Sequence, residues 1–370
     1  MKRSGLFGLS MLMSAAVLSV LAITTGWSQS LTWLGTLGGR DSYAYGVSTG
    51  GNVVVGWARN AAFQQRAFRW ENGVMQDLGT LGGNLSEAYG VSAGGNVVVG
   101  WARDAAGRLR AFRWENGVMQ DLGTLGGSTS EAYGVSAGGD VVVGWARNAA
   151  GFRRAFRWEN GVMQDLGTLP GSFESEAYGV SAGGDVVIGW AYGAAGWFRA
   201  FRWENGVMQD LGTLGGRNSY AFGVSAGGNV VVGGAADAAG RLRAFRWENG
   251  VMQDLGTLGG IESVAFGVSA GGDVVVGRAQ DAAGRLRAFR WTAADGMEDL
   301  NITYADLLTP DSYLVEARAI SPNGRYIVGY GYNAATGRFE GYLLDTIPEP
   351  ASLLALGAGL AGLALRRRRR

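Results

Sequence analysis

The chain has 370 residues, 65 of them glycine, and contains neither histidine nor cysteine. These absences exclude Ser-His-Asp and Cys-His catalysis, histidine and thiolate metal sites, and disulfides. Basic residues number 32 and acidic residues 31, but seven of the basic residues and one acidic residue lie in the terminal segments. Residues 31–345 therefore hold 25 basic and 30 acidic residues, which argues against a nucleic-acid partner.

The N-terminal segment has the pattern of a secretory signal peptide. Lys2 and Arg3 precede an apolar stretch over residues 6–23. A short basic region followed by such a stretch is typical of export signals. We predict that residues 1–30 are a signal peptide cleaved near residues 25–30; an uncleaved membrane anchor is the alternative.

The body of the chain, residues 42–343, repeats one passage seven times. The glycine of an Ala-Tyr/Phe-Gly-Val-Ser phrase recurs every 44 or 45 residues, and a degenerate seventh copy has Ala319 at that place. The six glycines are Gly46, Gly90, Gly134, Gly179, Gly223 and Gly267. Periods of about 40–50 residues are typical of propellers, solenoids and similar arrays.

Each copy has the pattern of four short antiparallel strands. In the second copy these are residues 87–92, 96–102, 110–115 and 118–124, rich in valine and aromatic residues. Asn116-Gly117 is a two-residue hairpin turn between the third and fourth strands. No window has a helical period, so the repeat predicts an all-β fold, and four strands in about 45 residues make one propeller blade.

The two ends of the repeat region complement each other. The seventh copy has strands at 315–321, 326–332 and 339–344, but no fourth strand. An isolated segment at 31–37, Leu-Thr-Trp-Leu-Gly-Thr-Leu, matches the fourth strand of the second copy. We predict that it pairs with 339–344 and closes a seven-bladed β-propeller over residues 31–345, which hides two sheet edges. A parallel β-helix with two rungs per repeat is the alternative.

The C-terminal segment, residues 346–370, is more specific. Pro348, Glu349 and Pro350 precede an apolar run at 351–365 and then five arginines. This order resembles the PEP-CTERM sorting signal. The resemblance implies export in a Gram-negative bacterium and processing by an exosortase at residues 348–350. It also implies transient membrane anchoring through 351–365, with the protein delivered to the cell surface or the exopolysaccharide matrix.

The repeats themselves resemble the HAF family of probable extracellular repeats. The phrases Gly-Val-Ser, Val-Val-Gly-Trp and Asp-Leu-Gly-Thr-Leu-Gly-Gly fit that family across nearly all of residues 31–343. The family's His-Ala-Phe reads Arg-Ala-Phe here, starting at Arg66, Arg110, Arg154, Arg199, Arg243 and Arg287. This departure removes a titrating imidazole, and the resemblance implies no activity, because the family has none established.

Differences among the copies are confined to two kinds of segment. The turns between strands one and two, and between strands three and four, are almost identical in every regular copy. The connections between blades and the loops between strands two and three vary. In an up-and-down blade both variable segments emerge on one side, which we call the variable face, opposite the uniform face. Binding residues tend to lie on loops held by a rigid scaffold, so we expect function on the variable face.

Six residues of the variable segments are candidate ligand-binding residues, because aromatic side chains offer apolar faces to sugar rings and arginine offers donors. They are Tyr43, Phe173, Tyr192, Trp197, Arg217 and Tyr220. We expect a non-enzymatic binding or structural module for polysaccharide or for a protein of the surface or matrix. The alternative is a carbohydrate-active enzyme, a glycoside hydrolase or lyase that uses loop carboxylates.

No catalytic residue, cofactor or metal ligand is assigned from the sequence. Glu174 and Glu176 form the one locally unusual acidic pair, and solvated loop acids explain it more simply. Turns such as Asp104-Ala-Ala-Gly107 carry a single acid each, too few for calcium, so we expect that aspartate to cap its own turn.

A repeated charge pattern also suggests how the blades are joined. Each regular copy has an arginine in Phe-Arg-Trp and an aspartate in Gln-Asp-Leu, such as Arg113 and Asp121. The turn at Asn116-Gly117 pairs Phe112 with Asp121, so Arg113 and Asp121 point to opposite faces of their sheet. We therefore predict that the arginine of one blade bonds the aspartate of the next, since buried charges need partners.

Overall fold

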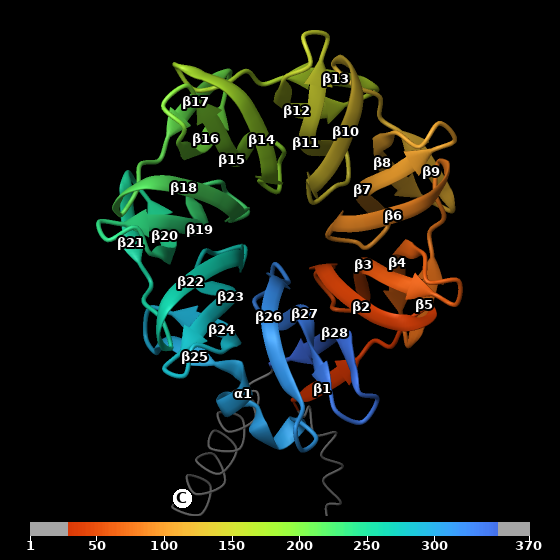
Figure 1. Ribbon diagram of the computed structural model, residues 1–370, viewed down its shortest axis with the longest axis vertical. Coiled ribbons are helices and arrows are strands. Elements are labelled where there is room, and N and C mark those ends of the chain that lie inside the picture. Colours follow the sequence, from red (N-terminus) through yellow and green to blue (C-terminus); the bar gives the residue numbers. More distant parts are fainter. Residues whose placement is uncertain (1–28, 347–370) are drawn as a thin grey trace, which may run out of the picture. The chain divides into compact units, whose positions relative to one another are not determined.

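The computed structural model describes residues 29–346 and shows seven four-stranded antiparallel sheets arranged in a ring around a central channel (Figure 1). The fold is a seven-bladed β-propeller, as the repeat predicts, and the β-helix alternative is wrong. No helix within residues 29–346 is long and apolar enough to cross a membrane. The predicted signal peptide up to residue 28, the cleavage motif and the anchoring segment 351–365 lie outside the described residues.

Blades 1 to 6 are continuous in the chain, and each contributes four consecutive strands. Blade 1 comprises β2 (Gly38–Val47), β3 (Val53–Asn60), β4 (Gln65–Glu71) and β5 (Val74–Asp77), and blade 2 comprises β6 (Gly82–Val91), β7 (Val97–Asp104), β8 (Leu109–Glu115) and β9 (Val118–Asp121). Blade 3 comprises β10 (Gly126–Val135), β11 (Val141–Asn148), β12 (Arg153–Glu159) and β13 (Val162–Asp165), and blade 4 comprises β14 (Ser172–Val180), β15 (Val186–Gly193), β16 (Phe198–Glu204) and β17 (Val207–Asp210). Blade 5 comprises β18 (Gly215–Val224), β19 (Val230–Asp237), β20 (Leu242–Glu248) and β21 (Val251–Asp254), and blade 6 comprises β22 (Gly259–Val268), β23 (Val274–Asp281), β24 (Leu286–Thr292) and β25 (Gly296–Asp299).

Blade 7 is assembled from both ends of the described chain. It comprises β26 (Tyr313–Ile320), β27 (Tyr326–Asn333), β28 (Arg338–Asp345) and β1 (Ser30–Trp33). Between blades 6 and 7 the longest connection forms two short helical turns, α1 (Leu300–Thr303) and η1 (Ala305–Leu307). These turns are the one departure from the predicted all-β pattern in the described part of the chain, and they arise because Asp299 caps α1 through the backbone N–H of Asn301.

The core lies between the blades. A run such as Val97-Val98-Val99 is apolar throughout because its sheet is covered on both faces. Val98 packs with Phe112 against blade 1, whereas Val97 and Val99 pack against blade 3. Successive strand residues point to opposite faces, so one apolar run fills two layers, and the ring is a circle of seven such layers.

The hairpin turns form as the sequence predicts. Asn116 and Gly117 both have positive φ, 50° and 84°, which a two-residue turn of this type requires. The register pairs Phe112 with Asp121 and Glu115 with Val118, as expected. The first strand of the blade is longer than predicted, because β6 begins at Gly82 rather than at residue 87. The variable residues that were assigned to blade connections therefore lie mostly on the inner strand of each blade.

The predicted closure is confirmed. β1 pairs antiparallel with β28, with Leu31 opposite Leu344 and Trp33 opposite Tyr342. The junction of blade 7 with blade 1 also repeats the bonding of a regular junction. The Gly341 N–H donates to Ser42 Oγ at 2.9 Å, as the Ala111 N–H donates to Ser130 Oγ at 3.0 Å between blades 2 and 3.

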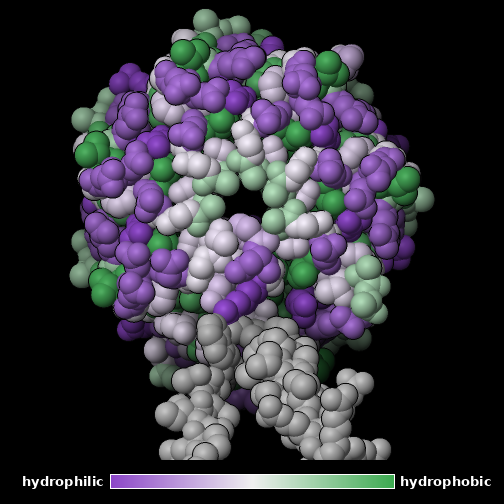
Figure 2. All heavy atoms as spheres, turned by 180° about the vertical axis from the view of Figure 1, so that it is seen from behind, coloured by the Kyte–Doolittle hydropathy of each residue, from purple (hydrophilic) through white to green (hydrophobic). Residues whose placement is uncertain are grey.

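A circle of hydrogen bonds links the blades at the uniform face. The Ala93 N–H donates to the Ala137 carbonyl at 3.1 Å, and equivalent bonds continue through each following blade to Pro322. Proline has no N–H to continue the circle. The side chain of the next residue, Asn323, donates instead to the Thr49 carbonyl at 3.0 Å and completes it. Figure 2 shows this face, with white and pale green residues, of intermediate hydropathy, around most of an open central hole.

The predicted arginine–aspartate bond between blades is wrong. Arg113 Nε donates to the Gly139 carbonyl of the next blade at 3.1 Å, and its Nη1 lies 2.8 Å from Glu115 in its own strand. Asp121 accepts the N–H of Gly123 at 2.8 Å. The backbone of its own turn therefore holds the aspartate, and the arginine finds a nearer acceptor in a backbone carbonyl. The blades are still joined through this arginine, but by a different partner.

Candidate functional site

The segments that vary among the copies do share one face. In blade 1, Gly38 at the start of β2 pairs with Asn60, where the β3–β4 loop begins. The same contact recurs in blade 2 between Gly82 and Asp104. The helical connection of blade 7 lies near the β23–β24 loop, since Asn301 and Arg285 line one pocket. The variable face is thus a continuous surface around one mouth of the channel.

An aromatic strip crosses blades 4 and 5 on this face. Phe173 contacts Tyr192 edge-on at 5.3 Å between ring centres, and Phe198 lies 4.7 Å from Tyr192 and 5.2 Å from Tyr220. Phe152 extends the strip beyond Phe173, at 6.2 Å, and is 42% exposed. Phe198, which was not predicted, therefore connects Tyr220 to the predicted pair of Phe173 and Tyr192. Phe198 stands where other copies have Leu109 or Leu242, which is the signal that could have revealed it.

Trp197 and Arg217 form a pair near this strip. The guanidinium carbon of Arg217 lies 4.3 Å from the centre of the Trp197 ring, a stacking geometry that holds both side chains in place. The Phe198 N–H donates to Asn218 Oδ1 at 3.0 Å, which ties the two loops together. Five of the six predicted residues thus belong to one region.

Tyr43 does not belong to that region. Its ring stacks on Trp57 at 4.4 Å and contacts Tyr330 of blade 7 at 4.6 Å. With Tyr330 and Phe339 it lines a separate cavity of about 630 Å³ over blade 7. The circular order of the blades accounts for this, because blade 1 adjoins blade 7 and lies far from blades 4 and 5 around the ring.

The central channel is lined by a ring of mostly aromatic residues, which was not predicted from the sequence. A cavity of about 380 Å³ is lined by one residue from each blade, at the position before the marker glycine: Tyr45, Tyr89, Tyr133, Tyr178, Phe222, Phe266 and Arg318. Towards the uniform face the channel is lined by small apolar residues such as Val91 and Ala93, and that cavity measures about 130 Å³. The repeated Ala-Tyr-Gly phrase was the available signal.

Four glutamates lie beside this ring, two residues earlier on the inner strands: three before tyrosines, and Glu316 before Arg318. The Tyr89 hydroxyl donates to Glu87 at 2.6 Å, and Tyr133 and Tyr178 donate to their own glutamates at 2.7 and 3.1 Å. Those partners are Glu131 and Glu176. Glu176 is therefore not a solvated loop acid but a buried group, 2% exposed, and Glu174 lies partly exposed on the same strand.

Burial changes the protonation of these acids. Loss of solvent raises the pKa of Glu87 to about 7, and the nearby charge of Glu131 adds to the shift. The pKa values of Glu131 and Glu176 are also raised by burial. Arg153 Nη1 lies 2.6 Å from Glu176 and partly offsets the effect there. Carboxyls that hold a proton near neutrality can act as hydrogen-bond donors or as general acids.

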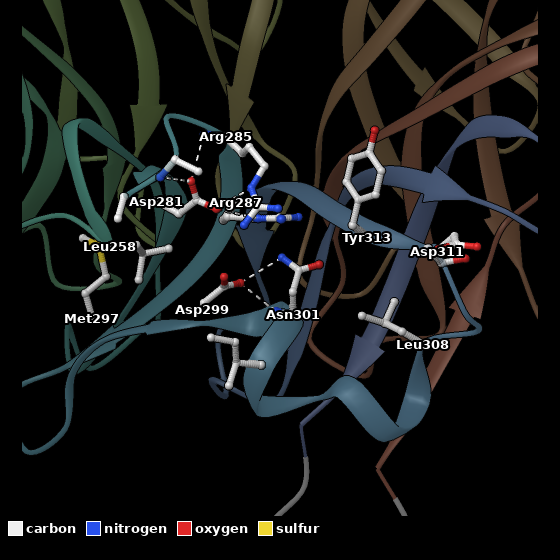
Figure 3. Close-up of a pocket in the computed structure, with 14 residues that line it drawn as sticks. Leu258, Asp281, Arg285, Arg287, Met297, Asp299, Asn301, Leu308, Asp311 and Tyr313 are labelled. Atoms are coloured by element: carbon white, nitrogen blue, oxygen red, sulfur yellow. Dashed lines mark hydrogen bonds and ion pairs between the residues drawn. The ribbon is translucent and has the colours of Figure 1, made fainter.

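A cavity of about 900 Å³ lies beside the helical connection between blades 6 and 7 (Figure 3). Arg285 and Arg287 both reach Asp281, at 2.8 and 3.4 Å. Across the cavity Asp299 accepts the backbone N–H and the side-chain amide of Asn301, both at 2.8 Å. Tyr313 forms the inner edge, with Arg287 5.7 Å from its ring centre.

The aspartates of the loops behave as turn caps. Asp104 Oδ1 accepts the N–H groups of Ala106 and Arg108, both at 2.9 Å, as predicted. Within residues 29–346 there is no cluster of three or more acidic residues suited to hold a metal ion.

Comparison with known proteins adds one functional element. The family model for the PEP-CTERM protein-sorting motif matches residues 346–369. The chain carries a PEP-CTERM sorting motif, which implies export and processing by exosortase. The predicted sorting signal is thus confirmed, with its implication of a Gram-negative cell, while the resemblance of the repeats to the HAF family stays a prediction. No curated protein sequence matches the chain.

Similar solved structures share the propeller fold. The propeller domain of the Trilobed protease from Pyrococcus furiosus is 7% identical, with a TM-score of 0.54 over 86% of this chain and 96% of that one. A prolyl endopeptidase is 12% identical, with a TM-score of 0.52 over 84% of this chain and 51% of its own. TolB from Acinetobacter baumannii is 14% identical, with a TM-score of 0.47 over 76% of each chain. At these identities the likeness concerns the fold alone.

Proposed function

We propose that this propeller is a non-enzymatic binding module that holds polysaccharide at the cell surface or in the extracellular matrix. The sorting signal supports the location, because exosortase substrates are exported. The aromatic strip over blades 4 and 5 supports the binding role. Sugar rings present C–H faces that pack on aromatic side chains, and their hydroxyls bond to polar edges.

The aromatic strip is the observation that carries this proposal. Phe173, Tyr192, Phe198 and Tyr220 follow one another at 4.7–5.3 Å between ring centres. All four side chains are partly exposed, so their packing leaves surface for a ligand. The nearby Trp197–Arg217 pair adds a large ring and hydrogen-bond donors.

The test is glycan binding by the full-length protein with Tyr192, Trp197 and Tyr220 replaced by alanine. We expect an affinity loss of about tenfold or more, since each stacked ring contributes on the order of 1 kcal/mol. A glycan array identifies the ligand, and calorimetry on the best hit measures the affinity of each variant.

The matched control replaces three exposed valines of the uniform face, Val74, Val118 and Val162, each about two-thirds exposed, with alanine. This variant should bind like the wild type. Equal losses in both variants, with unchanged melting temperatures, contradict the proposal, and so does capture of surface proteins with no glycan bound.

The glutamates at the channel mouth favour a second candidate, a carbohydrate-active enzyme. A pKa of about 7 suits Glu87 as a general acid at neutral pH, and Glu131 is near enough to influence it. This candidate requires release of reducing ends from the bound polysaccharide and loss of that release in Glu87→Gln. If the protein binds the polysaccharide and releases no reducing ends, the result supports the non-enzymatic binding module.

A further inference from the structure

The two cavities over blade 7 meet. The 900 Å³ cavity beside α1 and the 630 Å³ cavity near Tyr43 share three lining residues, Arg285, Arg287 and Tyr313. Each volume lies within the range of about 300–1,000 Å³ that is common for ligand pockets. Together they form a groove, which we call the blade 7 groove, that runs from α1 past the two arginines towards Tyr330 and Phe339.

This groove exists because the regular junction between blades changes here. At regular junctions a buried serine such as Ser130 bridges two blades and accepts a backbone N–H of the preceding one. At the junction of blades 6 and 7 Asn301 bonds both backbone groups of Leu314 instead, at 2.6 and 3.0 Å. The connection that carries Asn301 leaves space between α1 and the β23–β24 loop, and that space is the cavity in Figure 3.

The carboxylates at the centre of the groove, Asp281 and Asp299, already accept hydrogen bonds from the protein. Asp281 accepts two backbone N–H groups of its turn, at 2.9 Å each, besides the arginines. These bonds, first that from Arg285, lower the pKa of its carboxyl to about 2, so it stays charged and occupied. Asp299 is bonded to Asn301 and caps α1. Neither acid is available to bind a cation.

The guanidinium N–H groups of Arg285 and Arg287, in contrast, are only partly hydrogen-bonded. Arg285 is bonded to Asp281 through Nε, and its side chain is 66% exposed. Arg287 reaches the same carboxylate only through Nε, at 3.4 Å, and no described residue accepts from its Nη groups. In blades 1, 4 and 5 the equivalent arginine bonds the aspartate of its fourth strand at 3.0–3.2 Å, but here Asp299 is committed to α1.

We propose that the blade 7 groove binds an acidic oligosaccharide, with the carboxylate of a uronate residue held by Arg285 and Arg287. A guanidinium fork pairs with a planar carboxylate through two parallel bonds. The rings of Tyr313, Tyr330, Phe339 and Tyr43 then provide stacking surfaces for the neighbouring sugars. This inference rests on the proposed polysaccharide-binding function and names a second site and its ligand class.

The chain offers a matched control for each arginine. Arg110 in blade 2 makes the same bond as Arg287, with Nε 3.4 Å from Asp104, and 14% of its side chain is exposed against 15%. Arg108 corresponds to Arg285, with the same 2.8 Å bond to its aspartate. Blade 2 has no helical connection beside these residues, and Arg110 also lies 3.7 Å from Asp121.

The experiment is calorimetric titration of the full-length protein with a galacturonate tetrasaccharide and with its methyl ester, which lacks the charge. We expect Arg287→Gln and Arg285→Gln to lower the affinity for the acid about tenfold or more, because a bond to a charged group is lost. Arg110→Gln and Arg108→Gln should change it less than about twofold. The methyl ester should bind all five proteins weakly and alike.

Several outcomes overturn the inference and leave the proposed function standing. One is an equal loss of affinity for the acid in the arginine variants of blade 2 and of blade 6. Another is equal affinity of the wild type for the acid and its methyl ester. A third is that Tyr192→Ala abolishes binding of the acid while Arg287→Gln does not. Equal competition by an oligoglutamate peptide also overturns it, since the site then reads charge without sugar rings. If neither the tetrasaccharides nor any glycan on the array binds, the proposed function itself is contradicted.

Discussion

The two faces of this propeller are built from the same repeat, but they differ in how strictly its residues are kept from copy to copy. At the uniform face the same backbone bond joins the six junctions from blade 1 to blade 7, through the circle from Thr49 to Pro322. At the five junctions from blade 1 to blade 6 an arginine also reaches the next blade's glycine carbonyl. At the variable face, equivalent positions of the inner strands hold tyrosine, glutamate or valine, as at Tyr43, Glu87 and Val264. Bonds between blades therefore recur at the uniform face, whereas those at the variable face, such as Arg153 to Glu176, differ from blade to blade.

This division explains why the candidate sites are unevenly distributed. The aromatic strip, the glutamates and the blade 7 groove all lie on the variable face, each built by a few blades only. A scaffold secured at one side allows side chains at the other side to change with little cost in stability. Three predictions test this division, beginning with the largest expected effect.

Removing the closing strand should show whether the uniform face can hold the ring alone. Deleting residues 30–37 removes the packing of Leu31, Trp33 and the buried Leu34. We expect a loss of roughly 5 kcal/mol in the free energy of unfolding, from about 1.5–3 kcal/mol per apolar side chain. The exposed edge of β28 should also promote association. Thermal unfolding and light scattering of the full-length protein measure both effects, and an unchanged melting temperature would show that the hydrogen-bond circle is sufficient.

The buried glutamates should make the free energy of unfolding fall as the pH rises towards 7. The pKa of Glu87 is about 7 in the folded protein and about 4.5 when unfolded, so the folded state binds more protons between these values. Stability should therefore decrease as pH rises from about 4.5 to about 7, by up to about 3 kcal/mol for this group. Urea titrations across this range measure the slope.

The substitution Glu87→Gln should reduce that slope, because the group can no longer lose a proton. Glu115→Gln, at the uniform face beside Arg113, is the control and should leave it unchanged. A slope that is the same in both variants, or a wild type that becomes more stable towards pH 7, contradicts the assignment.

The bonds of the uniform face should have a smaller but uniform value. Arg157 donates to the Gly184 carbonyl at 3.0 Å and pairs with Glu159 at 2.9 Å. We expect Arg157→Ala to cost about 1–2 kcal/mol, because one buried acceptor loses its donor. Glu159→Gln removes only the partly exposed pair and should cost less than about 1 kcal/mol. Urea denaturation of both variants measures the difference, and equal costs would mean that the bond between blades contributes nothing.

The fold was predictable because the sequence signals for its strands and turns are local and recur in every regular copy. The spacing of the marker glycines, the Asn-Gly turns and the unmatched segment at 31–37 were enough for the blades, their number and their closure. The two-residue turn at Asn116-Gly117 predicted the register of Phe112 and Asp121 correctly. The partner of Arg113 was not predictable, because the choice between an aspartate and the Gly139 carbonyl depends on how adjacent blades are rotated.

The candidate sites were predictable only in part. Variation among the copies identified Tyr192, where other copies have arginine, alanine or glutamine, and Tyr220, where others have tyrosine, glutamate or valine. Glu87 and Glu131 were missed although the predicted first strand already begins at Glu87, because the sequence does not show how far the closed ring removes these side chains from solvent. The blade 7 groove depends on a helical connection with no internal counterpart for comparison.

The placement of β28 has a mechanical consequence. The strand lies between β27 and β1, and its last residue is clamped by Arg325, whose guanidinium bonds Asp345 twice at 2.8 Å. A pull on the chain beyond Thr346 acts along a strand that is paired on both sides. The load must shear two ladders of hydrogen bonds at once rather than peel one edge strand bond by bond. The ring therefore resists tension best at the end of the chain that bears its sorting signal.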